Sequence, residues 1–483
     1  MTGERCGYIL ETMTLNNLFK ILSLPCHDKR NVLGISDDSR IIQKDWLFLC
    51  RKGAQENGLH YVEDVLAKGG VVLWEEEAQN DCYHVDSMDV ALPLLLNSYY
   101  QTPCEKLCVI GVTGTNGKTS VTMILDQLLH MLQQPTMVIG TNHIRYLDQN
   151  IHIDNTTPSA CTLAYYFNKA VQEHIKYVLM EVSSHAIDQK RISFLQFDYV
   201  LYTNIAKDHL DYHITRTHYM YTKFKLRKYL KQHGVIIINH DMEELHPLYQ
   251  LSDDKIITFG KQQAHFQITD VTYSARGIFF ALEGTNYEIP LLGEMNVYNA
   301  AEALVVLHHL KFLAISCQKA ASLLQCVPGR MEIIEHKDSI VWLDYAHTES
   351  ALEEVCQLAH LVKQTKLICV VGCGGDRDKE KRPNMARIAL RYSDFVIFTA
   401  DNPRSEEIHA ILFDMIRDLV GNYEIRENRA CAIKSAMTIA QSHDIIVIAG
   451  KGDETTQSIN GKKYPLQDRE LVERYSKMEE QDL

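Results

Sequence analysis

The sequence predicts an α/β protein of several domains, with parallel β-sheets in its second and third sections. Three observations predict this fold class. The chain has 483 residues, more than one hydrophobic core usually organises, which suggests two to four domains. Short apolar runs typical of buried strands alternate with helix-length segments along most of the chain. A glycine-rich loop, Gly111–Ser120, directly follows one of these runs.

The composition is that of a soluble globular protein with a large core. Apolar residues make up 46% of the chain and charged residues 23%. The net charge of −13 argues against a surface that coats nucleic acid, which requires clustered Lys and Arg. The N-terminal stretch MTGERCGYILETMTLNNLF lacks the apolar region of a signal peptide, and no apolar run reaches the ~18 residues of a membrane span. We therefore expect a cytoplasmic protein that binds neither nucleic acid nor membrane.

The cysteines predict reduced thiols. There are 13 of them, an odd number, scattered from Cys6 to Cys431. The close pairs Cys104/Cys108 and Cys369/Cys373 lack C-x-x-C spacing and a histidine at zinc-finger distance. Core thiols of a cytosolic protein are the simplest interpretation.

The chain divides into three sections, with predicted domain boundaries near residues 104 and 330. The first section, 1–104, alternates short apolar runs such as Val71–Trp74 with helical patches and shows no catalytic cluster. The second, 105–330, has strand-like runs at Leu107–Ile110, Tyr177–Met180, Tyr199–Leu201 and Val235–Ile238. The third, 331–483, has them at Ile340–Leu343, Leu367–Val371, Phe395–Phe398 and Ile445–Ile448. This alternation is typical of parallel β-α units, whose binding loops follow the carboxyl ends of the strands.

The strongest motif is the phosphate-loop pattern GVTGTNGKTS, Gly111–Ser120. Glycines let backbone N–H groups turn toward a phosphate, and the helix that follows offers its positive N-terminal end. Lys118 would neutralise the β- and γ-phosphates of a nucleotide, and the Thr119 hydroxyl would bind Mg²⁺. Five residues separate Gly111 from Gly117, so the spacing departs from the strict G-x-x-x-x-G-K pattern.

Two further strand ends carry polar side chains. Glu181 ends the second strand-like run of the central section, where a nucleotide-bound magnesium finds a carboxylate ligand. The next run leads into NIAKDHLDYH, which brings together Asp208, His209, Asp211 and His213. From these residues alone, the second group is equally compatible with a transition-metal site and with a polar loop.

Taken together, the motifs resemble those of the Mur ligase family. TGTNGKTS, EVSSHA, DHLDYH, GEMNVYNA, VPGRME and LDYAHT occur in the family's order and span essentially the whole chain. ISDDSR, NTTPS, GCGGDRDKEKRP, DNPRSEE and AGKGDE resemble the branch that adds the third amino acid to UDP-N-acetylmuramoyl-L-alanyl-D-glutamate. The resemblance implies three domains. A small α/β N-terminal domain holds uridine, a central P-loop parallel-sheet domain holds ATP, and a Rossmann-like C-terminal domain holds the incoming amino acid.

The resemblance also implies roles for individual residues. ATP is expected at Gly114, Thr115, Asn116, Gly117, Lys118, Thr119, Ser120, Asn296, Asn299, Arg330 and Asp344. The UDP-muramoyl dipeptide is expected at Asp38, Ser39, Arg40, Asn155, Thr156, Thr157, Ser183, Gln189 and Arg191. The catalytic set is Lys118, Glu181, His209 and Lys223, and the Mg²⁺ set is Thr119, Glu181, His209 and Lys223. Lys223 aligns with the lysine that is N-carboxylated in the family, and from the sequence alone it is one surface lysine among several.

The amino-acid site is expected at Arg377, Asp401, Asn402, Pro403, Arg404, Gly450 and Glu454. Meso-diaminopimelate carries one carboxylate more than L-lysine, and the planar fork of Arg404 is suited to bind it. The sequence therefore favours diaminopimelate, with L-lysine as the alternative. It departs from the family's pattern at Asp453, which replaces a histidine, at Ile408, which replaces a proline, and in Ile139–Tyr146, which is poorer in glycine.

The reaction implied is amide formation through an acyl phosphate, by a monomer that binds only small-molecule substrates. Two other functions are compatible with parts of the pattern. A folylpolyglutamate synthetase-like ligase shares the phosphate loop but does not explain ISDDSR or DNPRSEE. A non-catalytic Mur-like binding protein would have lost residues of the catalytic set, and all of them are present here.

Overall fold

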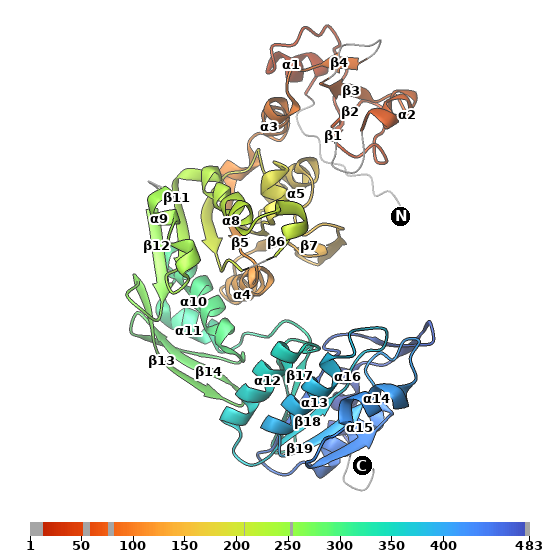
Figure 1. The fold of residues 1–483 in the computed structure, drawn as a ribbon. Coiled ribbons are helices and arrows are strands. Elements are labelled where there is room, and N and C mark those ends of the chain that lie inside the picture. The colour runs from red at the N-terminus through yellow and green to blue at the C-terminus, as the bar shows by residue number, and fades with distance from the viewer. Residues whose placement is uncertain (1–12, 52–57, 76–81, 207, 252–254, 479–483) are drawn as a thin grey trace. The chain divides into compact units, whose positions relative to one another are not determined.

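The computed structural model describes residues 13–51, 58–75, 82–206, 208–251 and 255–478 (Figure 1). The chain forms two compact units. Unit 1 comprises residues 1–265 and 302–306, and unit 2 comprises residues 266–301 and 307–483. The domain boundaries near residues 104 and 330 stay predictions, and Cys6 and most of the N-terminal stretch lie outside the described residues.

Unit 1 begins with a small parallel sheet between helices. Its strands, in the order β1-β2-β3-β4, are Gly34–Ser36, Trp46–Leu49, Val71–Trp74 and Cys82–His84. Its helices are α1 (Leu15–Lys20), α2 (Val62–Ala67) and α3 (Met88–Tyr99). Alternate residues of β3 face opposite sides, so that Val72 packs with Val65 of α2 while Leu73 packs in the cluster that contains α1 and α3.

The main sheet of unit 1 is mostly parallel. In the order β12-β11-β10-β5-β9-β6-β7-β8, its strands are Lys255–Gly260, Leu230–Asn239, Phe197–Tyr202, Cys108–Thr113, Tyr177–Glu181, Thr136–Gly140, His143–Tyr146 and Gln149–His152. All pairs from β12 to β6 are parallel, and β7 and β8 are antiparallel additions. The apolar runs of the central section therefore form strands, and the prediction of parallel β-α units is confirmed.

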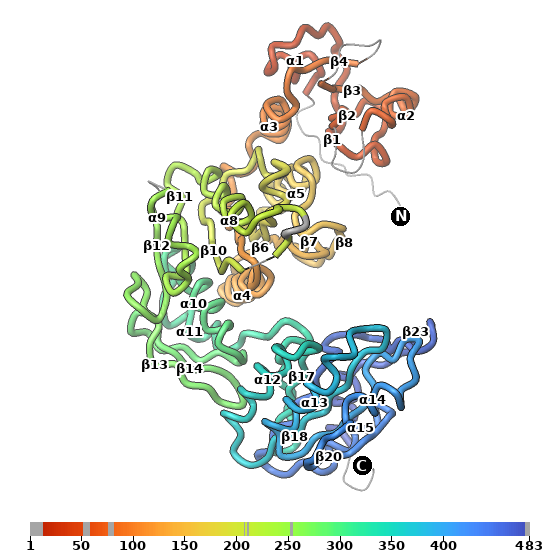
Figure 2. The backbone as a smooth tube through the Cα atoms, viewed as in Figure 1, coloured from red at the N-terminus to blue at the C-terminus, as the bar shows by residue number. Residues whose placement is uncertain are grey.

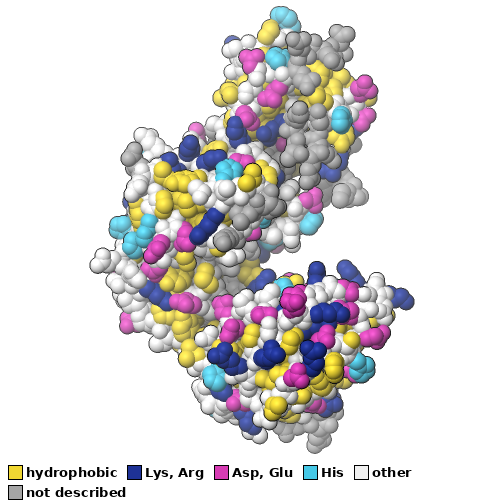
Figure 3. All heavy atoms as spheres, viewed as in Figure 1, with side chains coloured by type: hydrophobic (Ala, Val, Ile, Leu, Met, Phe, Trp, Pro, Cys, Tyr) yellow, Lys and Arg dark blue, Asp and Glu magenta, His cyan; other side chains and the backbone are white. Residues whose placement is uncertain are grey.

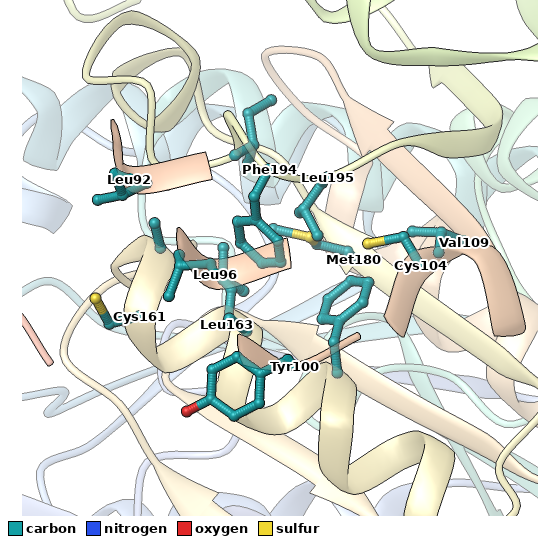
Figure 4. Close-up of a cluster of buried hydrophobic side chains, with 14 of the residues drawn as sticks. Leu92, Leu96, Tyr100, Cys104, Val109, Cys161, Leu163, Met180, Phe194 and Leu195 are labelled. Carbon is teal, nitrogen blue, oxygen red and sulfur yellow. The ribbon is translucent and has the colours of Figure 1, made fainter. Parts of the chain in front are cut away.

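The other helices of unit 1 belong to the central section, and most of them bury apolar side chains. They are α4 (Lys118–Met131), α5 (Ala160–Gln172), α6 (Ser184–Asp188), α7 (Leu210–His213), α8 (Arg216–Phe224) and α9 (Leu248–Leu251), with short 3₁₀ turns at Gly58–Tyr61, Pro103–Lys106, Lys225–Tyr229 and Glu243–Leu245. Figure 4 shows Leu92 and Leu96 of α3 in one buried cluster with Leu163 of α5 and Phe194. The N-terminal section thus shares a core with the central one.

Unit 2 begins with an antiparallel meander and two helices. The strands are β13 (Phe266–Ser274), β14 (Gly277–Leu282) and β15 (Thr285–Ile289), and the helices are α10 (Glu294–His309) and α11 (Ala314–Ala321). Residues 302–306 of α10 belong to unit 1. A six-stranded sheet follows in the order β16-β17-β21-β18-β19-β20. Its strands are Glu332–His336, Ser339–Asp344, Ile445–Ala449, Leu367–Val371, Phe395–Thr399 and Tyr423–Arg426, and all pairs except β16–β17 are parallel.

Helices cover both faces of this sheet, which makes it a doubly wound α/β layer (Figure 2). On one face lie α12 (Glu349–Val362), α13 (Lys381–Tyr392) and α14 (Ile408–Ile416), and on the other lie α15 (Arg429–Ile439) and α16 (Asp468–Ser476). Successive strand residues point to opposite faces, so Trp342 packs with the first group and Leu343 with the second. The antiparallel hairpin of β22 (Thr456–Ile459) and β23 (Lys462–Pro465) follows β21 along the chain. The Rossmann-like sheet predicted for the third section is confirmed.

The surface and the thiols agree with the composition. On the face drawn in Figure 3, basic and acidic side chains are interspersed. The described cysteines form no disulfide bonds, and most of them are buried. Within the described residues, the structure contains no helix whose length and apolar character would let it span a membrane.

Candidate active site

The phosphate loop connects β5 to α4 at the carboxyl edge of the main sheet in unit 1. Gly117 has a φ of 83°, a left-handed conformation that favours glycine, and it caps the N-terminus of α4. At Gly114 the loop passes so close to Thr203 that a Cβ would lie 1.9 Å from its Oγ1. Lys118, Thr119 and Ser120 therefore form the first turn of α4, where free backbone N–H groups and the helix dipole favour an anion.

The end of the neighbouring strand β10 fixes the conformation of this loop. Asn204 accepts a hydrogen bond from the Asn116 amide at 2.9 Å and donates its own side-chain amide to the Asn116 carbonyl at 3.0 Å. The Thr203 hydroxyl donates to the same carbonyl at 2.6 Å, and the Thr115 amide donates to the Asn204 carbonyl at 2.9 Å. Sequence analysis missed Thr203 and Asn204. Their position directly after a strand next to the phosphate loop is the signal that identifies them.

Two lysines converge on the Gly114 carbonyl. Lys118 Nζ donates to it at 3.0 Å and to the Thr115 carbonyl at 2.9 Å, and Lys223 Nζ donates to it at 2.8 Å. Burial lowers the pKa of Lys118, although Glu181 and Asp208 oppose this. Burial, reinforced by the charge of Lys118, lowers the pKa of Lys223 well below its usual range.

Lys223 is not a surface residue. It is 1% exposed on α8, and its Nζ lies 4.7 Å from the centre of the Tyr219 ring. The Tyr219 hydroxyl lies 3.2 Å from Thr115 Oγ1, so this tyrosine joins the lysine to the phosphate loop. The sequence reading of Lys223 as one surface lysine among several was wrong, because folding buries the α8 face that carries it.

The carboxylate of Glu181 lies beside the phosphate loop. Thr119 Oγ1 donates to Glu181 Oε2 at 2.9 Å, while the Thr141 amide and hydroxyl donate to Oε1 and Oε2 at 3.0 and 3.2 Å. Gly140 lets the carboxylate approach, since a Cβ there would lie 2.3 Å from Oε1. Thr141 is a third residue that the sequence motifs did not identify. The pairing of Thr119 with a buried carboxylate fits Mg²⁺, which uses few protein oxygens and completes its shell with water and phosphate.

The histidines of the DHLDYH segment divide into two environments. His209 is half-exposed, 3.4 Å from Asp208, and its ring contacts those of His185 and Tyr219. His213 is buried with its Nε2 2.9 Å from Ser184 Oγ, and burial, reinforced by His185, lowers its pKa to about 4. Among the described side chains, no three His, Cys, Asp or Glu residues converge as metal ligands. The transition-metal interpretation of this segment therefore gains no support, and His209 stays a predicted ligand of Mg²⁺.

The residues predicted for the muramoyl dipeptide lie next to the Glu181 strand end. The Thr157 hydroxyl donates to the Glu181 carbonyl at 2.9 Å and accepts from the Ser183 amide at 3.1 Å. Arg191 donates to the Thr157 carbonyl at 2.8 Å and to the side-chain oxygen of Gln189 at 2.6 and 2.9 Å. Thr156 Oγ1 lies 3.4 Å from Thr141 Oγ1, and Asn155 is exposed beside it.

Asp38, Ser39 and Arg40, which are predicted to face the uridine diphosphate part of that substrate, form a turn after β1 in which only Arg40 is exposed. The guanidinium of Arg40 donates to both carboxylate oxygens of Asp38, which lowers the pKa of Asp38. The Ser39 carbonyl accepts from Lys68 Nζ at 2.9 Å. Neighbouring Asp37, which sequence analysis did not select, accepts from Ser159 Oγ at 2.7 Å and so ties this turn to the segment that contains Thr156 and Thr157.

Four predicted ATP contacts lie in unit 2. Asn299 donates to the side-chain oxygen of Asn296 at 3.1 Å, one turn apart on α10. Asp344, at the end of β17, accepts the amides of Met331 and Ala346 at 2.7 Å each, and burial raises its pKa. The Arg330 guanidinium lies 4.8 Å from the centre of the Tyr345 ring. The β17 end and the Arg330 segment are thereby held together.

Most of the residues predicted to bind the incoming amino acid lie in the loops after β19 and β21. Asn402 donates to Glu454 Oε2 at 2.8 Å, and Lys451, which sequence analysis missed, donates to the same oxygen at 2.8 Å. Burial alone would raise the pKa of Glu454, but these two donors outweigh it and the pKa is lowered. Burial raises the pKa of Asp401, and a Cβ on Gly450 would lie 2.5 Å from its Oδ2.

The positive charge of Arg404 acts on the Glu454 carboxylate. Arg404 Nη1 donates to the Gly375 carbonyl at 2.6 Å, and the positive charge of Arg404 contributes to the low pKa of Glu454. Arg377 is exposed on the loop after β18, and Pro403 is buried between Asn402 and Arg404. A carboxylate and a guanidinium in one region of the protein complement the ammonium and carboxylate of an amino-acid centre.

Comparison with known proteins places these features in a family. Family models for the "Mur ligase middle domain" and the "Mur ligase, glutamate ligase domain" match residues 112–307 and 329–452. The UDP-N-acetylmuramoyl-L-alanyl-D-glutamate--2,6-diaminopimelate ligase of Oceanobacillus iheyensis is 36% identical over 91% of this chain and 94% of its own length. The ligase of the same name from Bacillus velezensis is 37% identical over 93% of this chain and 94% of its own.

A solved structure of a ligase with this name superposes with a TM-score of 0.83 at 30% identity, covering 96% of this chain and 99% of its own. Sequence and fold thus agree over nearly the full length with one type of amide-forming ligase. The chain belongs to the Mur ligase family of ATP-dependent ligases and is most similar to its MurE-type members.

Proposed function

We propose that this protein adds meso-diaminopimelate to UDP-N-acetylmuramoyl-L-alanyl-D-glutamate, with ATP as the energy source, in cytoplasmic peptidoglycan precursor synthesis. The observation that carries the proposal is that the loops after β19 and β21 bring the Arg404 guanidinium close enough to Glu454 for its positive charge to help lower the pKa of that carboxyl. Lysine offers a side-chain ammonium to such a site but no second carboxylate. Diaminopimelate offers both, so its second carboxylate can bind the planar guanidinium of Arg404.

The phosphate loop supports the use of ATP. Lys118 must leave the carbonyls of Gly114 and Thr115 to contact the β- and γ-phosphates, and the first turn of α4 supplies N–H donors. The γ-carboxylate of the D-glutamyl residue then attacks the γ-phosphoryl group, ADP leaves, and an acyl phosphate forms. Lys118 neutralises charge on the phosphoryl oxygens during this transfer.

The second step forms the amide. The free α-amine of the diamino acid attacks the acyl phosphate, the tetrahedral intermediate collapses, and inorganic phosphate leaves with the proton of the amine released to solvent. Arg404, Asn402 and Glu454 hold the distal amino-acid centre, so that the reacting amine is presented in one orientation. Water must be excluded, because it would hydrolyse the acyl phosphate.

Thr119 and Glu181 would hold Mg²⁺, with His209 and carboxylated Lys223 nearby. When bound, the ion supplies positive charge to the phosphate oxygens. Lys223 suits carboxylation, because its buried, low-pKa amine is neutral and nucleophilic at a pH where an exposed lysine is protonated. A neutral amine and CO2 give the carbamate and one released proton, which turns a cation into an anion beside the Mg²⁺ site.

A phosphate-release assay tests the proposal. Purified protein is supplied with ATP, UDP-N-acetylmuramoyl-L-alanyl-D-glutamate and either meso-diaminopimelate or L-lysine. We expect release that depends on all three substrates, with kcat/KM at least ~100-fold higher for diaminopimelate, and Arg404→Ala should abolish most of that preference. Equal or faster turnover with L-lysine contradicts the choice of amino acid. Turnover of a folate substrate instead, or of none, favours the folylpolyglutamate synthetase-like or non-catalytic alternatives.

A further inference from the structure

Two neighbouring loops of unit 2 carry the arginines of the amino-acid site. Residues 372–377 follow β18 and include Arg377, and residues 401–406 follow β19 and include Arg404. The loops pack backbone to backbone: the Gly375 amide donates to the Asn402 carbonyl at 2.9 Å, and a Cβ on Gly375 would lie 1.9 Å from the Pro403 carbonyl oxygen. Both arginines adjoin Gly374, where a Cβ would lie 2.8 Å from Arg404 Nη1 and 3.8 Å from Arg377 Cγ.

The backbone at this junction is strained. Asp376 and Arg404 both have a φ of 54°, the left-handed region that costs a residue with a side chain ~1–3 kcal/mol unless its surroundings enforce it. Three hydrogen bonds hold the backbone of Asp376 and its neighbours in this conformation. The Asp376 amide donates to Glu406 Oε1 at 2.6 Å, and Ser405 donates to the Asp376 carboxylate from its hydroxyl at 2.6 Å and from its amide at 3.1 Å.

Glu406 is in turn held by a buried guanidinium. Arg382, in the first turn of α13, has a side chain that is 0% exposed. Its Nη2 donates to Glu406 Oε1 at 2.8 Å and its Nη1 to Oε2 at 3.1 Å. The hydrogen bonds from Arg382 lower the pKa of Glu406 to about 2, so this carboxylate is charged throughout the physiological range. A bidentate pair of this kind fixes both distance and orientation.

The same guanidinium also contacts the other loop. Arg382 Nη2 donates to the carbonyl of Gly374, the residue that both Arg377 and Arg404 adjoin, at 3.3 Å, and Nη1 donates to Asp414 on α14 at 2.8 Å. Arg382 therefore contacts the first loop directly at Gly374 and both loops through Glu406. It is too deeply buried to contact a substrate itself.

We propose that Arg382, acting through Glu406, is a positioning residue that sets the spacing of Arg377 and Arg404 and so determines selection of the diamino acid. This inference rests on the proposed function. Neither residue touches the reacting atoms. Their contribution is to fix two guanidinium groups at the separation that a second amino-acid centre requires, which a loosely held pair of loops would not maintain.

A matched pair of variants tests this. Glu406 and Asp414 both pair with the Arg382 guanidinium at 2.8 Å, but only Glu406 also binds the loop that carries Arg377. Glu406→Ala is expected to raise the KM for meso-diaminopimelate at least tenfold and to lower the preference over L-lysine by a similar factor. The KM values for ATP and the UDP-muramoyl dipeptide should change by less than twofold. Asp414→Ala should lower the Tm comparably and leave the KM for diaminopimelate within threefold.

A milder variant guards against misfolding. Ser405→Ala removes one hydrogen bond to Asp376 at an exposed position and should raise the same KM about threefold. The inference is overturned if the KM for diaminopimelate shifts equally in Glu406→Ala and Asp414→Ala. It is also overturned if this KM is unchanged in both Glu406→Ala and Ser405→Ala. In either case, turnover by the wild-type protein still supports the proposed function. Absence of wild-type turnover with either diamino acid refutes the proposed function, and the inference with it.

Discussion

At the scale of single residues, burial decides which lysine has unusual chemistry. Lys223 and Lys225 are two positions apart, yet the first is 1% exposed beside Lys118 and the side chain of the second is 47% exposed. We predict that Lys223→Arg lowers kcat at least ~100-fold, because a guanidinium cannot form a carbamate, and that Lys225→Arg changes kcat by less than twofold. Carbon-13 spectra of wild-type protein in labelled bicarbonate should show a carbamate signal that Lys223→Arg lacks. Its persistence in that variant would exclude Lys223 as the modified residue.

There is a physical reason why the sequence pointed to some residues around the phosphate loop and the amino-acid site but not to others. Lys118, Thr119 and Glu181 were predictable because the phosphate-loop motif and the strand end have local signatures. Thr141 was not, because its bonds to Glu181 arise only where the ends of β6 and β9 meet across the sheet. Lys451 was overlooked for a similar reason, since its partners Asn402 and Thr456 come together only in the fold.

A buried acid on α10 predicts how stability depends on pH. Glu302 is 1% exposed, its Oε1 has no hydrogen-bond partner among the described residues, and burial raises its pKa well above the usual 4.5. The folded state therefore holds a proton that the unfolded state releases above pH 4.5, and this carboxyl destabilises the fold by up to ~1.4 kcal/mol per pH unit as pH rises toward the folded pKa.

Glu302→Gln has no proton to lose. We expect it to unfold at a higher denaturant concentration than wild type at pH 8, with the difference shrinking toward pH 5. Denaturation followed by circular dichroism at several pH values measures this. A constant difference between the two proteins across that range would show that Glu302 does not titrate abnormally.

At the scale of secondary-structure elements, an ion pair joins α15 to α16 near Gly450, a residue predicted for the amino-acid site. Arg429 is 1% exposed, donates to both oxygens of Asp468 at 2.6 and 2.8 Å, and also donates to the Ala449 carbonyl at the end of β21. Removing one partner leaves a buried charge, so Arg429→Met should cost ~3–5 kcal/mol of unfolding free energy.

The double variant Arg429→Met/Asp468→Leu should recover most of that loss, because it leaves no buried charge. The exposed pair Arg276–Glu335 is the control, since its two side chains are 58% and 56% exposed and Arg276→Met should cost less than ~1 kcal/mol. Urea denaturation compares the four proteins. A loss in Arg429→Met no larger than in Arg276→Met would mean that the buried pair does not stabilise the fold.

Strands could be predicted from the sequence where their apolar pattern is strong, and could not be predicted where it is weak. Every apolar run that the sequence singled out forms a strand, because buried parallel strands are continuously apolar. The β7–β8 hairpin was missed, since His143–Tyr146 and Gln149–His152 are largely polar and lie at the edge of the sheet. Apolar periodicity carries no signal for such strands.

At the scale of the whole molecule, the division into two compact units predicts that ligands stabilise them selectively. The residues expected for the muramoyl dipeptide lie in unit 1, and those expected for the diamino acid lie in unit 2. Because each unit has its own core, we expect calorimetric unfolding to show more than one transition.

A ligand at 100 times its Kd stabilises the state that binds it by ~2.7 kcal/mol, which corresponds to a rise in Tm of roughly 5–10 °C for a unit of this size. The UDP-muramoyl dipeptide should therefore raise the midpoint temperature of the unit 1 transition. Diaminopimelate, at high concentration, should raise that of the unit 2 transition. Arg404→Ala should remove the effect of diaminopimelate alone, because only that ligand is expected to contact the Arg404 guanidinium in unit 2. One shared transition that both ligands raise equally would show that the two units unfold as a single cooperative body.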